Sequence, residues 1–285
     1  MENGMWQLGL STNAKRITEQ TFAEYAENGV QNMEISSSQI EDITHHADFG
    51  AFRRYAAAYG VTVWSLHLPF APFERMDISS LNAELRKNSV EICKDVLRKA
   101  PELGAKIAVI HPSAEPIRPE DRAARLEQSR MSLAELAEYA APLGITVAVE
   151  DLPRTCLGNC SAEIRALIAA DDRLRVCFDT NHLLTEKNVD FVRALGDKIV
   201  TLHVSDYDFR DEKHWMPGEG KSDWRALVDV LHEVHYEGVF MYEVNRTSSP
   251  TIHRDREVSL ADIAENYRAC MARQPLKPLG SVLVE

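Results

Sequence analysis

Residues 122–150 read RAARLEQSRMSLAELAEYAAPLGITVAVE, a stretch that contains a helix, a turn and a strand in succession. Apolar residues recur at steps of three and four, which predicts an amphipathic helix over 122–141. Gly144 suits the turn that ends such a helix, and the continuous apolar run 145–149 is typical of a strand buried on both faces. The strand ends on a charged residue, Glu150. The stretch therefore predicts one helix–strand unit of a parallel sheet.

The same unit recurs along the whole chain. Further apolar runs that indicate strands lie at 6–10, 33–35, 61–66, 107–110, 174–178, 199–204 and 239–242. Further segments with helical periodicity lie at 80–103, 163–170, 191–195, 224–235 and 260–272. Eight strand–helix repeats without a break in composition predict an α/β protein with a single (β/α)8 barrel domain over residues 1–273, a doubly wound open sheet being the alternative. Residues 274–285 are expected to pack on the barrel exterior or on a second subunit, and the latter would make the protein a homo-oligomer.

Composition excludes several classes of protein. The 285 residues include 45% hydrophobic and 27% charged residues, as in an ordinary globular protein, and the net charge of -12 argues against general nucleic-acid binding. No apolar run reaches the roughly 18 residues that a membrane span needs, and the N-terminus lacks the pattern of a secretory signal. The five cysteines are scattered, without the spacing of a zinc or redox motif. We therefore expect a reduced, cytoplasmic protein.

Polar side chains follow six successive predicted strands, at the point where each strand ends. They are His67, His111, Glu150, Asp179, His203 and Glu243. In a (β/α)8 barrel the C-terminal ends of the strands carry the active site. A single histidine that closes a strand is usually a hydrogen-bonded packing residue, but histidines and acids are rarely buried without partners. Six of them on one rim therefore predict a functional site.

Four of these residues form a plausible set of metal ligands. Glu150, Asp179, Glu243 and His203 provide three carboxylates and one imidazole, a mixture that suits Mn²⁺, Mg²⁺, Co²⁺ or Zn²⁺ better than the thiolate sites of structural zinc do. His182 follows three residues after Asp179 and is expected to contact the substrate or a second metal ion.

The segment 212–220, EKHWMPGEG, is predicted to be a loop because proline and glycine punctuate it. We expect Glu212 and His214 to lean over the cleft and Trp215 to cover one face of the substrate. Asp206 is a candidate hydrogen-bond partner of the histidines, while Asp208 is better interpreted as a solvated loop acid. Neither a G-x-G-x-x-G nor a G-x-x-x-x-G-K-[ST] motif occurs, so no nucleotide cofactor is predicted.

Seven short segments, in this order, resemble the xylose-isomerase-like TIM-barrel superfamily over roughly residues 5–245. They are SLHLP (65–69), VIHPS (109–113), AVED (148–151), FDTNH (178–182), LHVSD (202–206), HWMPGEG (214–220) and YEV (242–244). That superfamily holds sugar-phosphate isomerases and epimerases, the D-tagatose 3-epimerase type, inosose isomerases and dehydratases, and endonuclease IV. The ordered set is specific for the superfamily, whereas it says little about the substrate.

Resemblance to the epimerase branch implies an isomerase or epimerase of a sugar, a sugar phosphate or an inosose. One divalent ion would be held by the four ligands named above, and the ion would polarise the substrate's carbonyl. Glu150 and Glu243 would then remove and return a proton on the neighbouring carbon. His182 and Arg246 would contact the substrate, with Arg246 or Arg154 as a clamp for a phosphate or hydroxyl group.

Resemblance to the endonuclease branch implies two or three zinc ions instead. His67, His111 and Glu150 would form one site, the four ligands above a second, and His182, His214 and Glu212 a third. A zinc-dependent phosphoesterase is therefore an alternative, and a barrel that only binds a sugar is another. The negative net charge and the lack of a basic run that could grip a duplex favour the isomerase or epimerase.

Overall fold

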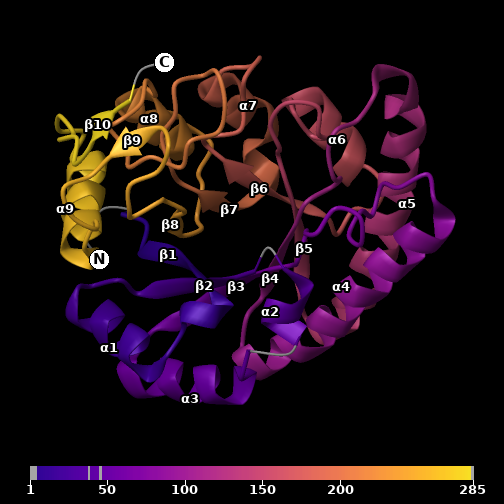
Figure 1. Cartoon of the computed structure of the whole chain (residues 1–285), viewed down its shortest axis with the longest axis horizontal. Coiled ribbons are helices and arrows are strands. Elements are labelled where there is room, and N and C mark those ends of the chain that lie inside the picture. The colour runs from indigo at the N-terminus through magenta and orange to yellow at the C-terminus, as the bar shows by residue number, and fades with distance from the viewer. Residues whose placement is uncertain (1–4, 38, 45–46, 284–285) are drawn as a thin grey trace.

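The predicted barrel is present in the computed structural model, which describes residues 5–37, 39–44 and 47–283 (Figure 1). In these residues one sheet contains eight parallel strands in the order β7-β6-β5-β4-β3-β2-β1-β8. They are β1 (Leu8–Asn13), β2 (Asn32–Ser36), β3 (Thr62–His67), β4 (Ile107–Ile110), β5 (Thr146–Glu150), β6 (Arg175–Asp179), β7 (Ile199–His203) and β8 (Phe240–Tyr242). Residues 284–285, at the end of the predicted tail, lie outside the described residues.

The sheet closes on itself through hydrogen bonds between β7 and β8, the first and last strands of the order given above. The Val204 amide just beyond β7 donates to the Met241 carbonyl at 2.8 Å, and the Glu243 amide beyond β8 donates to the Val204 carbonyl at 3.0 Å. Because these bonds join β7 to β8, the chain forms a barrel and not the open sheet that was the alternative.

Helices surround the barrel. They are α1 (Glu19–Glu27), α2 (Ile40–Thr44), α3 (Phe49–Tyr59), α4 (Ala83–Leu103), α5 (Arg122–Ala140), α6 (Ser161–Ile168), α7 (Asn188–Leu195), α8 (Trp224–Glu233) and α9 (Leu260–Met271). The sequence did not predict α1, α2 and α3. Gly144 follows a helical segment as expected, and Gly104 does the same after α4. Their φ values of 69° and 78° are left-handed, a conformation that side chains with a Cβ disfavour.

Two apolar layers fix the position of the site. The larger core packs the outward side chains of the strands against the helices, while a small cluster of Ile107, Val109, Ala148 and Cys177 lies apart from it. These four residues come from β4, β5 and β6 and are buried. Since the barrel interior is packed, open space for a ligand is expected at the C-terminal ends of the strands.

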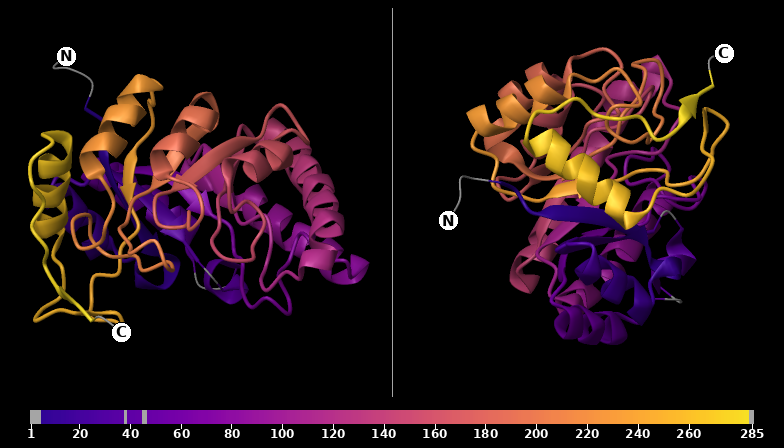
Figure 2. Two further views of the ribbon diagram at one scale, coloured as in Figure 1. Left: turned by 90° about the horizontal axis from the view of Figure 1, so that it is seen from above. Right: turned by 90° about the vertical axis from the view of Figure 1, so that its left-hand side faces the viewer.

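The C-terminal residues return to the barrel after α9. There β10 (Ser281–Val282) pairs antiparallel with β9 (Ile252–His253), which lies in the connection between β8 and α9. Figure 2 shows this segment running from α9 to the side of the barrel where the long loops gather. The Leu279 amide donates to the Glu219 carboxylate at 3.0 Å, so the segment also contacts the β7–α8 loop. Among the described residues, no helix combines the length and apolar character that a membrane crossing requires.

Candidate active site

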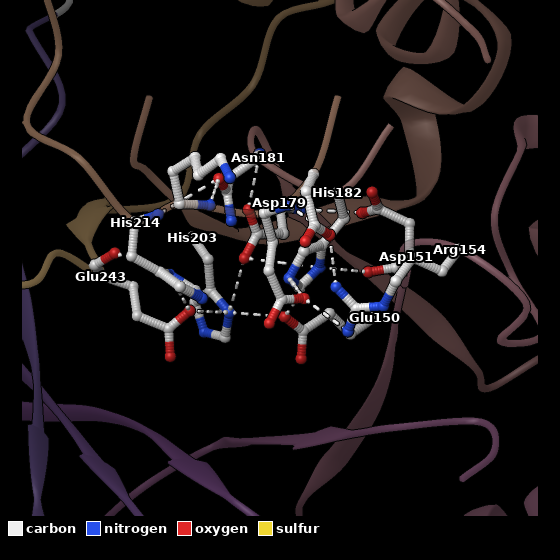
Figure 3. Close-up of polar contacts among 12 residues, drawn as sticks. Glu150, Asp151, Arg154, Asp179, Asn181, His182, His203, His214 and Glu243 are labelled. Carbon is white, nitrogen blue, oxygen red and sulfur yellow. Dashed lines mark hydrogen bonds and ion pairs between the residues drawn. The ribbon is translucent and has the colours of Figure 1, made fainter. Parts of the chain in front are cut away.

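The six strand-end residues meet at one end of the barrel. β6 and β7 pair in a register that sets Asp179 beside His203, and Glu150 ends the neighbouring strand β5. Four residues bring one potential ligand atom each to within 4.8 Å of one another: Glu150, Asp179, His203 and Glu243. Figure 3 shows these side chains pointing toward a common centre. The set of ligands predicted from the sequence is thus assembled by the fold.

Glu150 lies at the centre of the histidines. Its Oε1 atom lies 2.9 Å from His203 Nδ1, and its Oε2 atom lies 3.0 Å from His67 Nε2 and 3.1 Å from His111 Nε2. Burial alone would raise the pKa of Glu150, but the charges of His203 and His111 outweigh burial and hold it well below its usual range. Glu150 is therefore anionic, and the histidines satisfy both of its oxygens.

His67 and His111 contact the same carboxylate but differ in their other neighbours. His67 Nδ1 lies 2.8 Å from the Leu68 carbonyl, so both ring nitrogens face acceptors, and Glu150 raises the His67 pKa against the opposing effect of burial. Burial lowers the pKa of His111, whose ring stacks on Phe70 with centroids 4.0 Å apart. The same carboxylate thus holds two histidines whose pKa values are shifted in opposite directions, upward for His67 and downward for His111.

Glu34 is a buried acid at this site that the sequence analysis did not select. Its carboxylate accepts hydrogen bonds from Ser11 at 2.9 Å and Ser65 at 2.7 Å. Its Oε1 atom also lies 3.0 Å from His203 Nε2, although this contact lacks the geometry of a hydrogen bond. His203 is consequently held between two carboxylates, Glu34 and Glu150. A charged residue between Met33 and Ile35 in an apolar strand was the signal in the sequence.

Asp179 is fully buried and only half satisfied. Its Oδ1 atom accepts from the Asn181 amide at 2.7 Å, whereas Oδ2 has no hydrogen-bond partner. Burial and the charges of Glu243 and Glu150 raise the Asp179 pKa well above its usual range. A cation among these carboxylates would supply the missing partner and relieve the repulsion. The orphaned oxygen and the donor set of three carboxylates and one imidazole therefore fit a divalent metal ion.

A cavity of about 140 Å³ opens above this cluster. It is lined by His67, Phe70, Phe73, His111, Ser113, Glu115, Glu150, Leu152, Pro153, Arg154, Cys156, His182, Glu212, His214 and Glu243. Asp179 and His203 do not line the cavity and are completely buried. Glu150 and Glu243 are thus the two members of the cluster that reach the space in which a ligand would lie.

Asp151 and Asn181 hold two histidines, His182 and His214, at the cavity. His182 Nδ1 donates to the Asp151 carbonyl at 2.8 Å, which leaves its Nε2 atom as an acceptor. His214 has a φ of 50°, and its backbone amide donates to the Asn181 side chain at 3.2 Å. The His182 and His214 rings meet edge to face with centroids 6.0 Å apart. Both histidines line the cavity, as the sequence predicted.

The remaining predicted residues divide into two groups. Arg154 and Glu212 lie at the cavity, with Arg154 NH2 3.2 Å from Glu212 Oε2. Trp215 is 2% exposed, its indole donates to Thr251, and it does not line the cavity. Its backbone amide and carbonyl are both hydrogen-bonded to the backbone of Asp206, which fixes its position in the loop. Arg246 is also outside the lining and donates to the Val258 carbonyl at 2.7 Å.

Asp206 does not contact the histidines, contrary to the prediction. It accepts from the indole of Trp224 at 2.9 Å and from backbone amides of its own loop, so it organises the β7–α8 loop instead. Asp208 accepts from the Arg210 and Asp211 amides, which agrees with the interpretation as a loop acid.

Comparison with protein families identifies the barrel. Residues 22–270 match the model of the family described as xylose isomerase-like TIM barrel. The chain belongs to this family. The resemblance inferred from the strand-end motifs is thereby confirmed, and the matched residues include the strands from β2 to β8.

Individual relatives include proteins with and without an assigned activity. An uncharacterized protein of Methanocaldococcus jannaschii is 29% identical over 182 residues, which cover 61% of this chain and 62% of that protein, slightly less than two thirds of its length. A D-psicose 3-epimerase of Agrobacterium fabrum is 23% identical over 241 residues, or 81% of this chain and 80% of the enzyme. The crystal structure of a D-tagatose 3-epimerase-like protein superposes with a TM-score of 0.76 at 23% identity, covering 93% of this chain and 98% of that one.

The additional metal sites implied by the endonuclease branch are only partly reproduced in this family barrel. Within the described residues, a second set of ligand atoms within 4.8 Å consists of His67, Glu150 and His203. It shares Glu150 and His203 with the first set. His182, His214 and Glu212 do not form such a set in that part of the chain, although His182 Nε2 lies 3.7 Å from Glu212.

Proposed function

We propose that this family member is a sugar isomerase or epimerase that transfers a proton next to a carbonyl group. Glu150, Asp179, His203 and Glu243 would hold one divalent ion, Mn²⁺, Mg²⁺, Co²⁺ or Zn²⁺. The observation that carries the proposal is the convergence of these four side chains beneath a small cavity, which Glu150 and Glu243 line and from which Asp179 and His203 are shielded. The sugar epimerases among the relatives support the same reaction class.

Each residue has a distinct task in this proposal. A bound ion would supply Lewis-acid polarisation of the substrate's carbonyl oxygen. Glu150 and Glu243 come from β5 and the end of β8 and line the cavity, so one removes the proton from the neighbouring carbon and the other returns it. His182 presents its Nε2 acceptor to a substrate hydroxyl. Asp179 and His203, which are buried, act only as ligands.

The proposal is tested by metal content and proton exchange together. Protein purified without chelator is expected to contain about one divalent ion per chain. The metal-loaded protein is then incubated in D₂O with D-fructose, D-tagatose, D-psicose and inososes, and loss of the proton signal beside the carbonyl is followed by NMR. Exchange that stops on chelation and returns with metal supports the proposal. Two or three zinc ions with phosphoesterase activity would support the hydrolase instead, and stabilisation by sugars without exchange would indicate a binding protein.

Metal binding is predicted to release protons and to strengthen as the pH rises. In the metal-free protein, burial and neighbouring acids raise the Asp179 pKa, and the charges of Glu243, Glu34 and Glu150 raise the His203 pKa despite burial. Both residues must lose a proton to bind metal, so the affinity should increase up to about tenfold per pH unit for each proton released. Titration calorimetry of Mn²⁺ in buffers of different ionisation enthalpy measures the protons. An affinity independent of pH between about 6 and 8 would contradict this prediction.

Glu34 is predicted to position His203 for metal binding. Replacing Glu34 with glutamine keeps the two serine hydroxyl partners but removes the negative charge beside His203 Nε2. The variant should bind Mn²⁺ about 10- to 100-fold more weakly, the usual loss when the partner of a ligating histidine is removed. A matched control is Glu163→Gln, which removes a carboxylate that contacts Arg122 away from the cluster. Equal Mn²⁺ affinity in the Glu34 variant and the wild type would contradict the prediction.

A further inference from the structure

We propose that the substrate carries no phosphate group, and that Glu115, Asp211 and Glu212 at the mouth of the cavity exclude phosphorylated sugars. This inference rests on the proposed isomerase or epimerase function and specifies its substrate class as neutral, unphosphorylated sugars. Two independent features carry it. One is the negative charge around the cavity. The other is that arginines and backbone amides that could bind a phosphate are already bonded to carboxylates of the chain.

Carboxylates dominate the lining of the cavity. Glu115, Glu150, Glu212 and Glu243 face it, whereas Arg154 is the one arginine or lysine among its lining residues in the described part of the chain. His67 also lines the cavity, but its Nε2 atom already lies 3.0 Å from the Glu150 carboxylate. A divalent ion would offset the charge of Glu150 and Glu243, but at the mouth three carboxylates, Glu115, Asp211 and Glu212, still surround one arginine. A phosphate dianion would therefore meet an excess of negative charge there, and juxtaposed like charges strongly disfavour a wrong ligand.

Arg154 is already surrounded by acids. Its Nε atom lies 3.1 Å from both Glu115 carboxylate oxygens, and its NH2 atom lies 2.6 Å from Glu115 Oε1. NH1 donates to Asp211 at 2.6 Å, and NH2 lies 3.2 Å from Glu212. Figure 3 shows Arg154 at the edge of the cluster, beyond Glu150. To bind Arg154, a phosphate would have to displace one carboxylate and remain beside the other two.

Arg246, the other candidate for a phosphate clamp, is not among the residues that line the cavity. Its Nε atom donates to the Val258 carbonyl at 2.7 Å, and its NH2 atom lies 3.3 Å from Glu257. Both partners belong to the connection between β8 and α9. Both arginines singled out by the sequence are thus already paired with carboxylates of the protein.

An internal carboxylate occupies the backbone amides after β7. In (β/α)8 enzymes, phosphate is often bound by the loops after the seventh and eighth strands. Here the buried Asp206 accepts from the amides of Tyr207 at 2.9 Å, Gly218 at 2.9 Å and Ser222 at 3.1 Å. A Cβ atom on Gly220 would lie 2.3 Å from Asp206 Oδ1, so the loop is packed directly on this carboxylate. The place of a phosphate is therefore filled by the protein itself.

The amides that precede α6, after β5, are used in the same way. The Ser161 amide and hydroxyl donate to Glu186 at 2.6 and 2.7 Å, and the Gly158 amide donates to Glu163 at 2.6 Å. Carboxylates of the chain therefore take the anion-binding position that a helix N-terminus provides. This second occupied position agrees with a substrate that brings no anionic group.

The first test compares matched pairs of substrates. Exchange with D₂O is measured for the Mn²⁺-loaded protein with D-fructose, D-tagatose and D-psicose and with their 6-phosphates. We expect kcat/KM to be at least about a hundredfold higher for each free ketose than for its phosphate. Equal or better exchange of a phosphate ester would overturn the inference. If no sugar of either kind exchanges, the proposed function fails, and the second test decides the inference on its own.

The second test measures phosphate binding without turnover. Inorganic phosphate and D-fructose 6-phosphate are titrated into metal-free wild-type protein and into a Glu115→Gln/Glu212→Gln variant. We expect no saturable binding to the wild type and at least about tenfold stronger binding to the variant, since Arg154 then loses two acidic partners. Glu102→Gln/Glu237→Gln removes the same charge at exposed positions outside the cavity lining and should behave as wild type. Saturable binding to the wild type, or no gain in the rim variant, would overturn the inference.

Discussion

Replacing Glu243 with glutamine is expected to slow proton exchange at the substrate carbon by about a thousandfold, within the range that general acid–base groups contribute. Glu243 lines the cavity and is 26% exposed, and its Oε2 atom lies 3.4 Å from His203 Nδ1 and 3.8 Å from His214 Nδ1. With no partner as close as those of Glu150, glutamine should fit without disturbing the fold. The amide also keeps an oxygen that can act as a metal ligand, but it cannot accept the proton.

The measurement separates proton transfer from metal loss. Exchange is followed by NMR in D₂O at a Mn²⁺ concentration that saturates the variant, and elemental analysis confirms the bound ion. Undiminished exchange at full occupancy would remove Glu243 from the reaction. Glu150→Gln is expected to stop exchange too, but with weaker metal binding and lower stability, because His203 and His67 lose the anion that they contact at 2.9 and 3.0 Å.

Replacing Arg254 with methionine should lower the free energy of unfolding by about 3 to 5 kcal/mol, the usual cost of removing one partner of a buried ion pair. Arg254 NH1 and NH2 lie 2.5 and 2.6 Å from the two Glu219 oxygens, and neither side chain is exposed. Glu219 also accepts from the Met216 and Leu279 amides. The variant therefore leaves a buried carboxylate without its cation.

A nearby arginine provides the matched control. Arg256 makes a similar two-point contact with Asp262, at 2.5 and 2.8 Å, but its side chain is 63% exposed. Arg256→Met should therefore lower the free energy of unfolding far less than Arg254→Met does, because solvent screens exposed ion pairs. Both variants are compared by urea denaturation. Similar losses for the two arginines would show that burial of the Glu219 pair does not determine its contribution.

Residues at strand ends could be predicted from the sequence because their position follows directly from the alternation of strands and helices. Parallel strands bring their C-terminal ends to one rim, so Glu150, Asp179 and His203 were recognisable without coordinates. Glu34 was not, because it lies within β2, where side chains alternate between the barrel interior and the helices. Only the three-dimensional barrel shows that Glu34 reaches His203 on β7 across the interior.

Loop residues were less predictable for a different physical reason. Trp215 and Arg246 lie in connections whose course depends on contacts within the loops themselves, such as the pairing of Trp215 with Asp206 and of Arg246 with Val258. Trp215 and Arg246, although close in sequence to residues of the candidate site, therefore lie outside the cavity lining. The segments of α1 and α3 were missed because the periodicity of their apolar residues was not identified in the N-terminal third of the chain.

The contacts of the C-terminal segment have a consequence for limited proteolysis. Trypsin cleavage after the exposed Arg273 would detach Leu276, which packs on Gly218, and Leu279, which donates to Glu219. Both contacts hold the loop that also carries His214 to the cavity. Cleavage after Arg273, about 60 residues along the chain from this loop, should therefore change ligand binding before the barrel unfolds. The reason is that locally less stable segments open first.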